Sequence, residues 1–237
     1  MFKKHLSIFM LISRSSIYKV IGLITLMLLS ESILLFMTIQ EQPSFAMHII
    51  EGHTSWIFGI VFLLLTFLLS TFGWERSEKQ GYTVKRLSIS EKAFFFWQSL
   101  YNTICFLLLW MFQILFVIIA FHFAKDWITE EYLNHQSIFV AFIESDFLHS
   151  LLPFSEIYLW IRNILYAISM GLFTAFLPYL QRNEKPYIHH IYIVFYILLS
   201  FSQPIADMRT ILGLGIALVE IFGILATMLR KEPAHEN

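Results

Sequence analysis

Three ionisable side chains lie inside long apolar stretches: Glu31, Arg162 and Glu220. A charge that faces lipid is costly, so each should face protein or water. Counted from the expected helix ends, Glu31 lies ~21 Å and Arg162 ~22 Å from the inner membrane edge. The matching depths predict an ion pair between Glu31 and Arg162, within one bundle or across a subunit interface. The alternative is an Arg162 that reaches outward and a Glu31 that is solvated or protonated.

Three amide side chains, together with Glu220, could serve transport or hold helices together. Gln98, Asn102 and Gln113 fall in one apolar stretch, and Gln98 and Asn102 share a helical face because they are four residues apart. They either line a translocation pathway or join helices by hydrogen bonds, and the second interpretation is favoured. Glu220, near mid-membrane, lines a path, couples to protons or bonds to a neighbouring helix.

Motifs for catalysis and for phosphate binding are missing from the sequence. It contains neither GxxxxGK[ST] nor GxGxxG, so ATP-driven work would require another chain. The single Cys105 excludes an internal disulfide and a Cys-pair metal site. Glu130-Glu131 is interpreted as a solvated acidic face and His189-His190 as interfacial. We expect no enzyme activity, metal, cofactor or nucleic-acid partner.

Long apolar helices must position all these residues. The 237 residues are 57% hydrophobic and only 14% charged, and they include 25 Phe. Runs of about 18 or more apolar residues indicate membrane spans. We expect an all-α integral membrane protein with one domain, residues 1–237. Its six transmembrane helices are predicted at 17–39, 56–74, 93–124, 157–180, 188–203 and 211–229.

The distribution of cations predicts the orientation of these spans. With the N-terminus inside, most of the 16 Lys and Arg residues fall on the cytoplasmic side, and only Lys125 and Arg209 lie outside. The positive-inside rule therefore predicts that both termini are cytoplasmic. Residues 1–16 are expected to form an interfacial helix or, alternatively, an ordinary basic flank. Residues 125–156 form the predicted extracellular loop, with short helices that dip into the interface.

A charged segment, residues 75–92, separates the second and third predicted spans. Tyr82, Lys85, Arg86 and Ile89 fall at helical spacing. Ser90 is a plausible N-cap for the third span, and Ser88 with Glu91 would make a capping box. The segment is predicted to form a short cytoplasmic helix, a turn and then a long membrane helix.

This segment resembles the coupling helix of permease subunits of ATP-binding-cassette (ABC) exporters of the type-2 family. The resemblance rests on a glutamate turn, a glycine and a threonine-leucine-serine pattern between spans two and three, and on the six-span topology. It departs from the family at Ile89, where many members have proline, and in its long loop between spans three and four. The resemblance assigns ATPase coupling to Glu78, Gly81, Tyr82, Thr83, Lys85, Arg86, Leu87 and Ser90.

The resemblance implies a permease subunit in the plasma membrane of a bacterium, powered by separate ATPase subunits. A second permease subunit, identical or related, completes the pathway through the lipid bilayer. The expected cargo is a hydrophobic or amphipathic compound or peptide. The alternative is a stand-alone secondary transporter or channel that uses Glu31, Arg162 and Glu220 for ion coupling. A membrane enzyme is disfavoured because no catalytic constellation is present.

Overall fold

The structure, a computed structural model, describes residues 2–41, 46–71, 90–124, 145–154, 156–182, 188–202 and 207–229. These residues are helical apart from short connections and helix ends, and no strand occurs among them. The helices are α1 (Phe2–Glu41), α2 (Ala46–Ser70), α4 (Glu91–Ala124), α6 (Asp146–Leu151), α7 (Ile157–Arg182), α8 (Ile188–Ser202) and α9 (Asp207–Leu229).

Four helices are long and apolar enough to cross a membrane, at Phe9–Met37, Lys92–Phe123, Ile157–Leu180 and Met208–Leu229. The all-helical class and its membrane character are therefore confirmed. Two predicted spans correspond to shorter apolar segments, Thr54–Ser70 of α2 and Ile191–Phe201 of α8. Six spans and cytoplasmic termini remain predictions.

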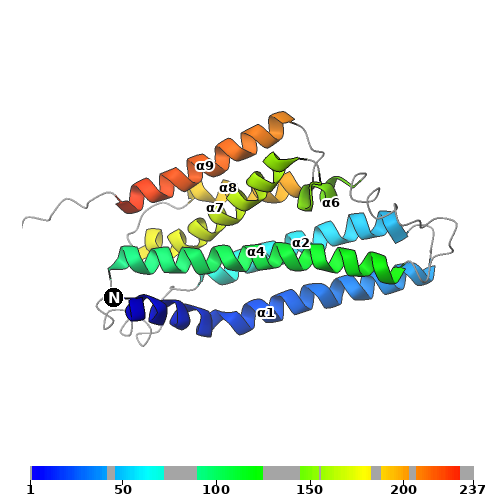
Figure 1. The fold of residues 1–237 in the computed structure, drawn as a ribbon, viewed down its shortest axis with the longest axis horizontal. Coiled ribbons are helices and arrows are strands. Elements are labelled where there is room, and N and C mark those ends of the chain that lie inside the picture. Colours follow the sequence, from blue (N-terminus) through cyan, green and yellow to red (C-terminus); the bar gives the residue numbers. More distant parts are fainter. Residues whose placement is uncertain are drawn as a thin grey trace, which may run out of the picture.

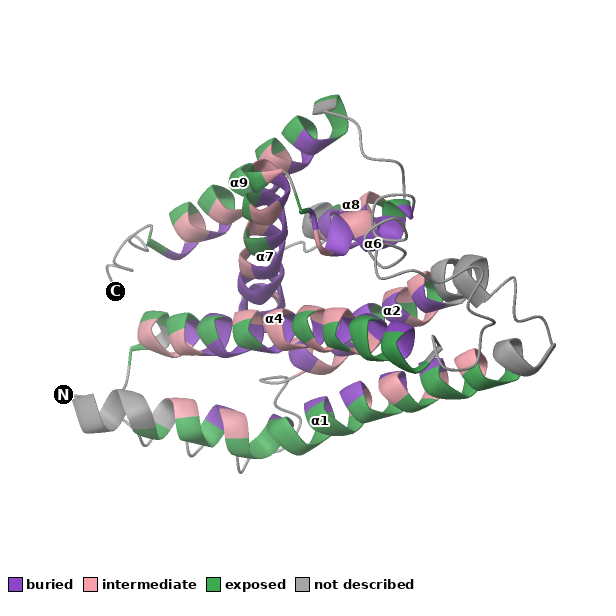
Figure 2. Ribbon diagram, turned by 45° about the vertical axis from the view of Figure 1, so that its right-hand side comes forward, coloured by how far each residue is buried: buried purple, intermediate pink, exposed green. Residues whose placement is uncertain are grey.

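Helix α7 lies at the centre of the bundle, packed mainly against α4 and α9 (Figure 1). In an 18-residue stretch of its span 78% of the residues are buried, against 22% in such a stretch of α1 and 28% in one of α9 (Figure 2). Small residues allow this close packing. A Cβ added at Gly171 would lie 2.7 Å from the backbone nitrogen of Thr103, in α4, and would also clash with the Thr103 hydroxyl. The α4–α7 contact therefore depends on a glycine at position 171.

Helix α1 is continuous over 40 residues, so the predicted interfacial helix, residues 1–16, and the predicted span 17–39 belong to one helix. The interfacial position of the first part stays a prediction. Figure 1 shows that α1 changes direction near the end of its darkest blue part. The hydroxyls of Ser13, Ser15 and Ser16 donate to carbonyls three or four residues earlier. Such back-bonding often bends helices without ending them, which accounts for a bent but continuous α1.

Helix α4 begins directly after Ser90, close to the predicted boundary of the third span. The Ser90 hydroxyl accepts a hydrogen bond of 3.3 Å from the backbone amide of Ala93, so the predicted N-cap is confirmed. With 34 residues, α4 extends ~51 Å at the usual rise per residue. The other coupling residues assigned by resemblance, Glu78 to Leu87, lie outside the described residues.

Candidate functional site

A cluster of polar contacts surrounds Arg162, whose side chain is only 3% exposed. Its guanidinium donates to the Asn163 side-chain oxygen at 3.1 Å and to the Ser150 carbonyl at 3.4 Å. The rings of Tyr166 and Phe201 flank it, with centroids 5.6 and 5.9 Å away. These dipoles and aromatic faces provide the stabilisation that a carboxylate was expected to give.

The short helix α6 is fixed by the helices around it. The Ser150 carbonyl also accepts from the Asn163 amide at 2.7 Å, and the Ser150 hydroxyl lies 3.3 Å from the Phe201 carbonyl in α8. From α4, the Trp110 indole N–H donates to the Leu151 carbonyl at 2.9 Å. Short helices were predicted in 125–156, and α6 is one, with four of its six residues buried in the bundle. Its predicted interfacial position stays a prediction, and residues 125–144 lie outside the described residues. We call the following residues the α6 cluster: Trp110, Ser150, Leu151, Arg162, Asn163, Tyr166 and Phe201.

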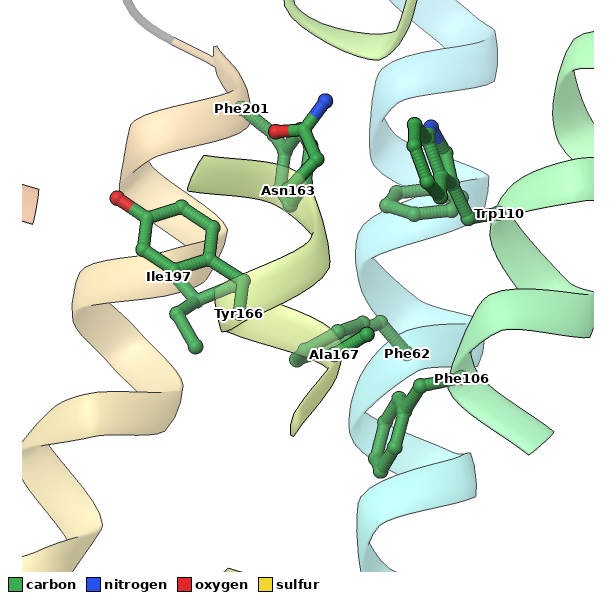
Figure 3. Close-up of a pocket in the computed structure, with 9 residues that line it drawn as sticks. Phe62, Phe106, Trp110, Asn163, Tyr166, Ala167, Ile197 and Phe201 are labelled. Atoms are coloured by element: carbon green, nitrogen blue, oxygen red, sulfur yellow. The ribbon is translucent and has the colours of Figure 1, made fainter. Parts of the chain in front are cut away.

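A small cavity lies beside the α6 cluster, between α2, α4, α7 and α8 (Figure 3). Its volume is about 20 Å³, room for roughly one water molecule. Figure 3 shows Trp110 and Asn163 toward one end and Phe62 and Phe106 toward the other. The lining is almost entirely aromatic or aliphatic: Phe58, Phe62, Phe106, Trp110, Asn163, Tyr166, Ala167, Ile197 and Phe201. The cavity as described is too small for an organic substrate.

Glu31 contacts Gln113 of α4, not Arg162. Its Oε2 atom accepts a hydrogen bond of 3.3 Å from the Gln113 amide. The predicted Glu31–Arg162 pair within one chain is therefore wrong. The two helices that carry these residues lie on opposite sides of α4 (Figures 1 and 2). Equal depth did not bring the residues together, because depth says nothing of position around the bundle.

The other polar residues predicted inside spans join helices. The Asn102 amide donates to the Thr174 hydroxyl of α7 at 2.9 Å, as the favoured interpretation predicted. Gln98 is buried on the same face as Asn102. Glu220 of α9 is buried, and the Tyr192 hydroxyl of α8 donates to its Oε2 atom at 3.3 Å. None of these side chains lines the described cavity.

Several contributors to the α6 cluster were missed from the sequence. Asn163 follows Arg162 directly in an apolar stretch, and this pairing of polar residues could have drawn attention to it. The carbonyls of Ser150 and Leu151 give no sequence signal, because any residue has a carbonyl. Trp110 was indistinguishable from the aromatic residues around it.

A contact at the other end of α4 joins distant parts of the chain. The Lys92 ammonium donates to the Leu229 carbonyl at the end of α9, at 3.4 Å. A cation at this position also interacts favourably with the partial negative charge of the helix C-terminus. Among the described residues, no group of three His, Cys, Asp or Glu is placed to hold a metal ion. Comparison of the chain with protein-family models, curated proteins and solved structures gave no match.

Proposed function

We propose that the chain is the membrane-spanning permease subunit of an ABC exporter in a bacterial plasma membrane. The observation that carries this proposal is the charged segment Glu78–Ser90, which resembles a coupling helix and leads directly into the capped N-terminus of α4. ATP hydrolysis belongs to separate ATPase subunits. Six spans with cytoplasmic termini would supply half of the pathway, and a second permease subunit the other half.

The contacts of α4 support a mechanical role for this helix. At its start, Ser90 caps it and Lys92 contacts α9. Further along, the Trp110 indole is bonded to the Leu151 carbonyl of α6. A displacement applied at residues 78–90 would therefore be transmitted through one continuous helix to the α6 cluster. In this mechanism, movement of α6 opens the small cavity beside it.

The cargo class follows from the lining of that cavity. Six of its nine lining residues are aromatic or aliphatic without a polar group, and the N–H of a seventh, Trp110, is already bonded to the Leu151 carbonyl. An enlarged cavity would therefore favour an apolar or amphipathic molecule. Asn163 and Tyr166 would supply its few polar contacts.

Charge reversal in the coupling segment tests the proposal. The double variant Lys85→Glu/Arg86→Glu should abolish co-purification of the ATPase subunit and stop export, with membrane insertion unchanged. The matched control is Lys3→Glu/Lys4→Glu, which changes the charge of another predicted cytoplasmic segment by the same amount. If the ATPase still co-purifies with the Lys85/Arg86 variant and export continues, the coupling role is excluded.

A stand-alone transporter or channel is the alternative, and it makes a different prediction. The purified chain, reconstituted without an ATPase, would then move an ion or a solute across liposomes. The proposed permease should show no such flux until ATPase subunits and ATP are added.

A further inference from the structure

The contact between Glu31 and Gln113 leaves two oxygen atoms without partners. Glu31 is 1% exposed and Gln113 is 0% exposed. One bond joins them, from the Gln113 amide to Glu31 Oε2. The Oε1 atoms of both side chains are buried and have no hydrogen-bond partner. Buried polar atoms in native proteins are rarely left unpaired, so this arrangement needs an explanation.

A single proton would satisfy both atoms. An ionised carboxylate only accepts hydrogen bonds, whereas a protonated one has an O–H group that donates. A carboxylic acid and a carboxamide are both planar forks, so they can face each other and form two hydrogen bonds in a ring. In that ring the Gln113 N–H donates to Glu31 Oε2, and the Glu31 O–H donates to Gln113 Oε1.

The surroundings of Glu31 favour the neutral acid. The described side chains of α2, residues 54–71, include no ionisable group. Along α4, the nearest cationic side chain before Gln113 is Lys92, and the nearest after it is His122, which is a cation only when protonated. His122 is the closer of the two, nine residues away or ~13 Å along the helix. Along α1, Lys19 is twelve residues from Glu31, ~18 Å away. Tyr101 and Cys105 of α4 and Tyr18 of α1 cannot supply a cation, because phenol and thiol groups never carry a positive charge in proteins. A buried carboxylate without a nearby cation is strongly disfavoured.

We propose that Glu31 and Gln113 form a proton-binding site, a carboxylic acid–carboxamide pair that joins α1 to α4. Separation of α1 from α4 would admit water to the acid and release its proton. The site couples a proton to the position of α1, and this inference does not depend on the proposed permease function.

Infrared spectroscopy of the full-length protein in lipid bilayers tests the protonation state. At neutral pH, the difference spectrum between wild type and Glu31→Gln should contain the carbonyl band of a protonated carboxylic acid. Glu220→Gln is the control, because it removes another buried carboxyl group and should leave that band in place. A carboxylate band in the Glu31 difference spectrum would overturn the proposal.

Two further variants test the pair itself. In Gln113→Leu the acid band should shift to higher frequency, since the acid loses its hydrogen-bond partner; an unshifted band would overturn the pairing. Glu31→Gln should keep the melting temperature of the wild type, because two amides can form the same ring. Glu31→Leu should lower it, and equal losses in both variants would contradict a neutral acid at this position.

Discussion

The contact of α4 with α7 and the contact of α4 with α1 use polar residues in different ways. On the α7 side, the Asn102 amide of α4 donates to the Thr174 hydroxyl of α7, and Gly171 allows the backbones to approach closely. On the α1 side, Glu31 has one hydrogen bond and an unpaired oxygen. The rest of the chain leaves most of the α1 span uncovered, whereas it buries most of the α7 span.

This difference indicates which contact is built to persist. The α4–α7 contact combines close backbone packing at Gly171 with the hydrogen bond between Asn102 and Thr174, and both would be lost together if the helices parted. The α1–α4 contact has two side-chain hydrogen bonds, Ser16–Tyr101 and Gln113–Glu31, and we propose that a further bond from Glu31 to Gln113 depends on a proton. We therefore expect α4 and α7 to move as one body and α1 to be the helix that can separate from them.

The largest expected effect is at Gly171. Gly171→Ala would force a methyl group against the Thr103 backbone, and overpacking of this kind should destabilise the fold by about 3 kcal/mol. The matched control is Gly22→Ala in α1, where no atom lies within 4 Å and the higher helix propensity of alanine should stabilise by about 0.5–1 kcal/mol. Denaturant unfolding in detergent measures the change in unfolding free energy for both variants. If Gly171→Ala and Gly22→Ala change it by similar amounts, the proposed difference between the α4–α7 and α1–α4 contacts is wrong.

Asn163 tests whether the α6 cluster is held by directed bonds. Asn163→Leu removes the acceptor for Arg162 and a donor to the Ser150 carbonyl, and it should cost about 2 kcal/mol. Asn163→Asp keeps an oxygen for Arg162 and should recover at least half of that loss. The measurement is the free energy of unfolding of wild type, Asn163→Leu and Asn163→Asp. If Asn163→Leu unfolds with the same free energy as wild type, packing alone fixes α6.

The smallest effects concern single hydrogen bonds in each contact. A double-mutant cycle with Asn102→Ala and Thr174→Val should give a coupling of about 1 kcal/mol, near the upper end for membrane helices. The cycle with Ser16→Ala and Tyr101→Phe should give about 0.5 kcal/mol or less. The Tyr101 hydroxyl also contacts Cys105, so it keeps a partner when Ser16 is lost. A larger coupling for Ser16 and Tyr101 would reverse the ranking of the two contacts.

Helix positions were largely predictable because apolar runs of span length have few other interpretations. The expected span 93–124 and helix α4, Glu91–Ala124, differ at their start by two residues. The Ser90 cap was predictable because capping is local. Residue pairing was not: Glu31 and Arg162 were matched on depth alone, and their partners turned out to be an amide, a carbonyl and aromatic rings. Such partners depend on which helices become neighbours, which the order of apolar runs does not determine.

The contact between Lys92 and Leu229 has a consequence for biosynthesis. The two residues are 137 positions apart in the chain, and Leu229 is the last residue of α9. The ribosome must therefore synthesise the chain through the end of α9 before this contact can form. Until then Lys92, at the start of α4, lacks this partner, so the end of the proposed coupling segment is held in place only after α9 has been made. A truncation before α9 should leave a protein that inserts into the membrane but cannot assemble with the proposed ATPase subunit. A fusion tag added after residue 229 would lie next to the proposed coupling segment.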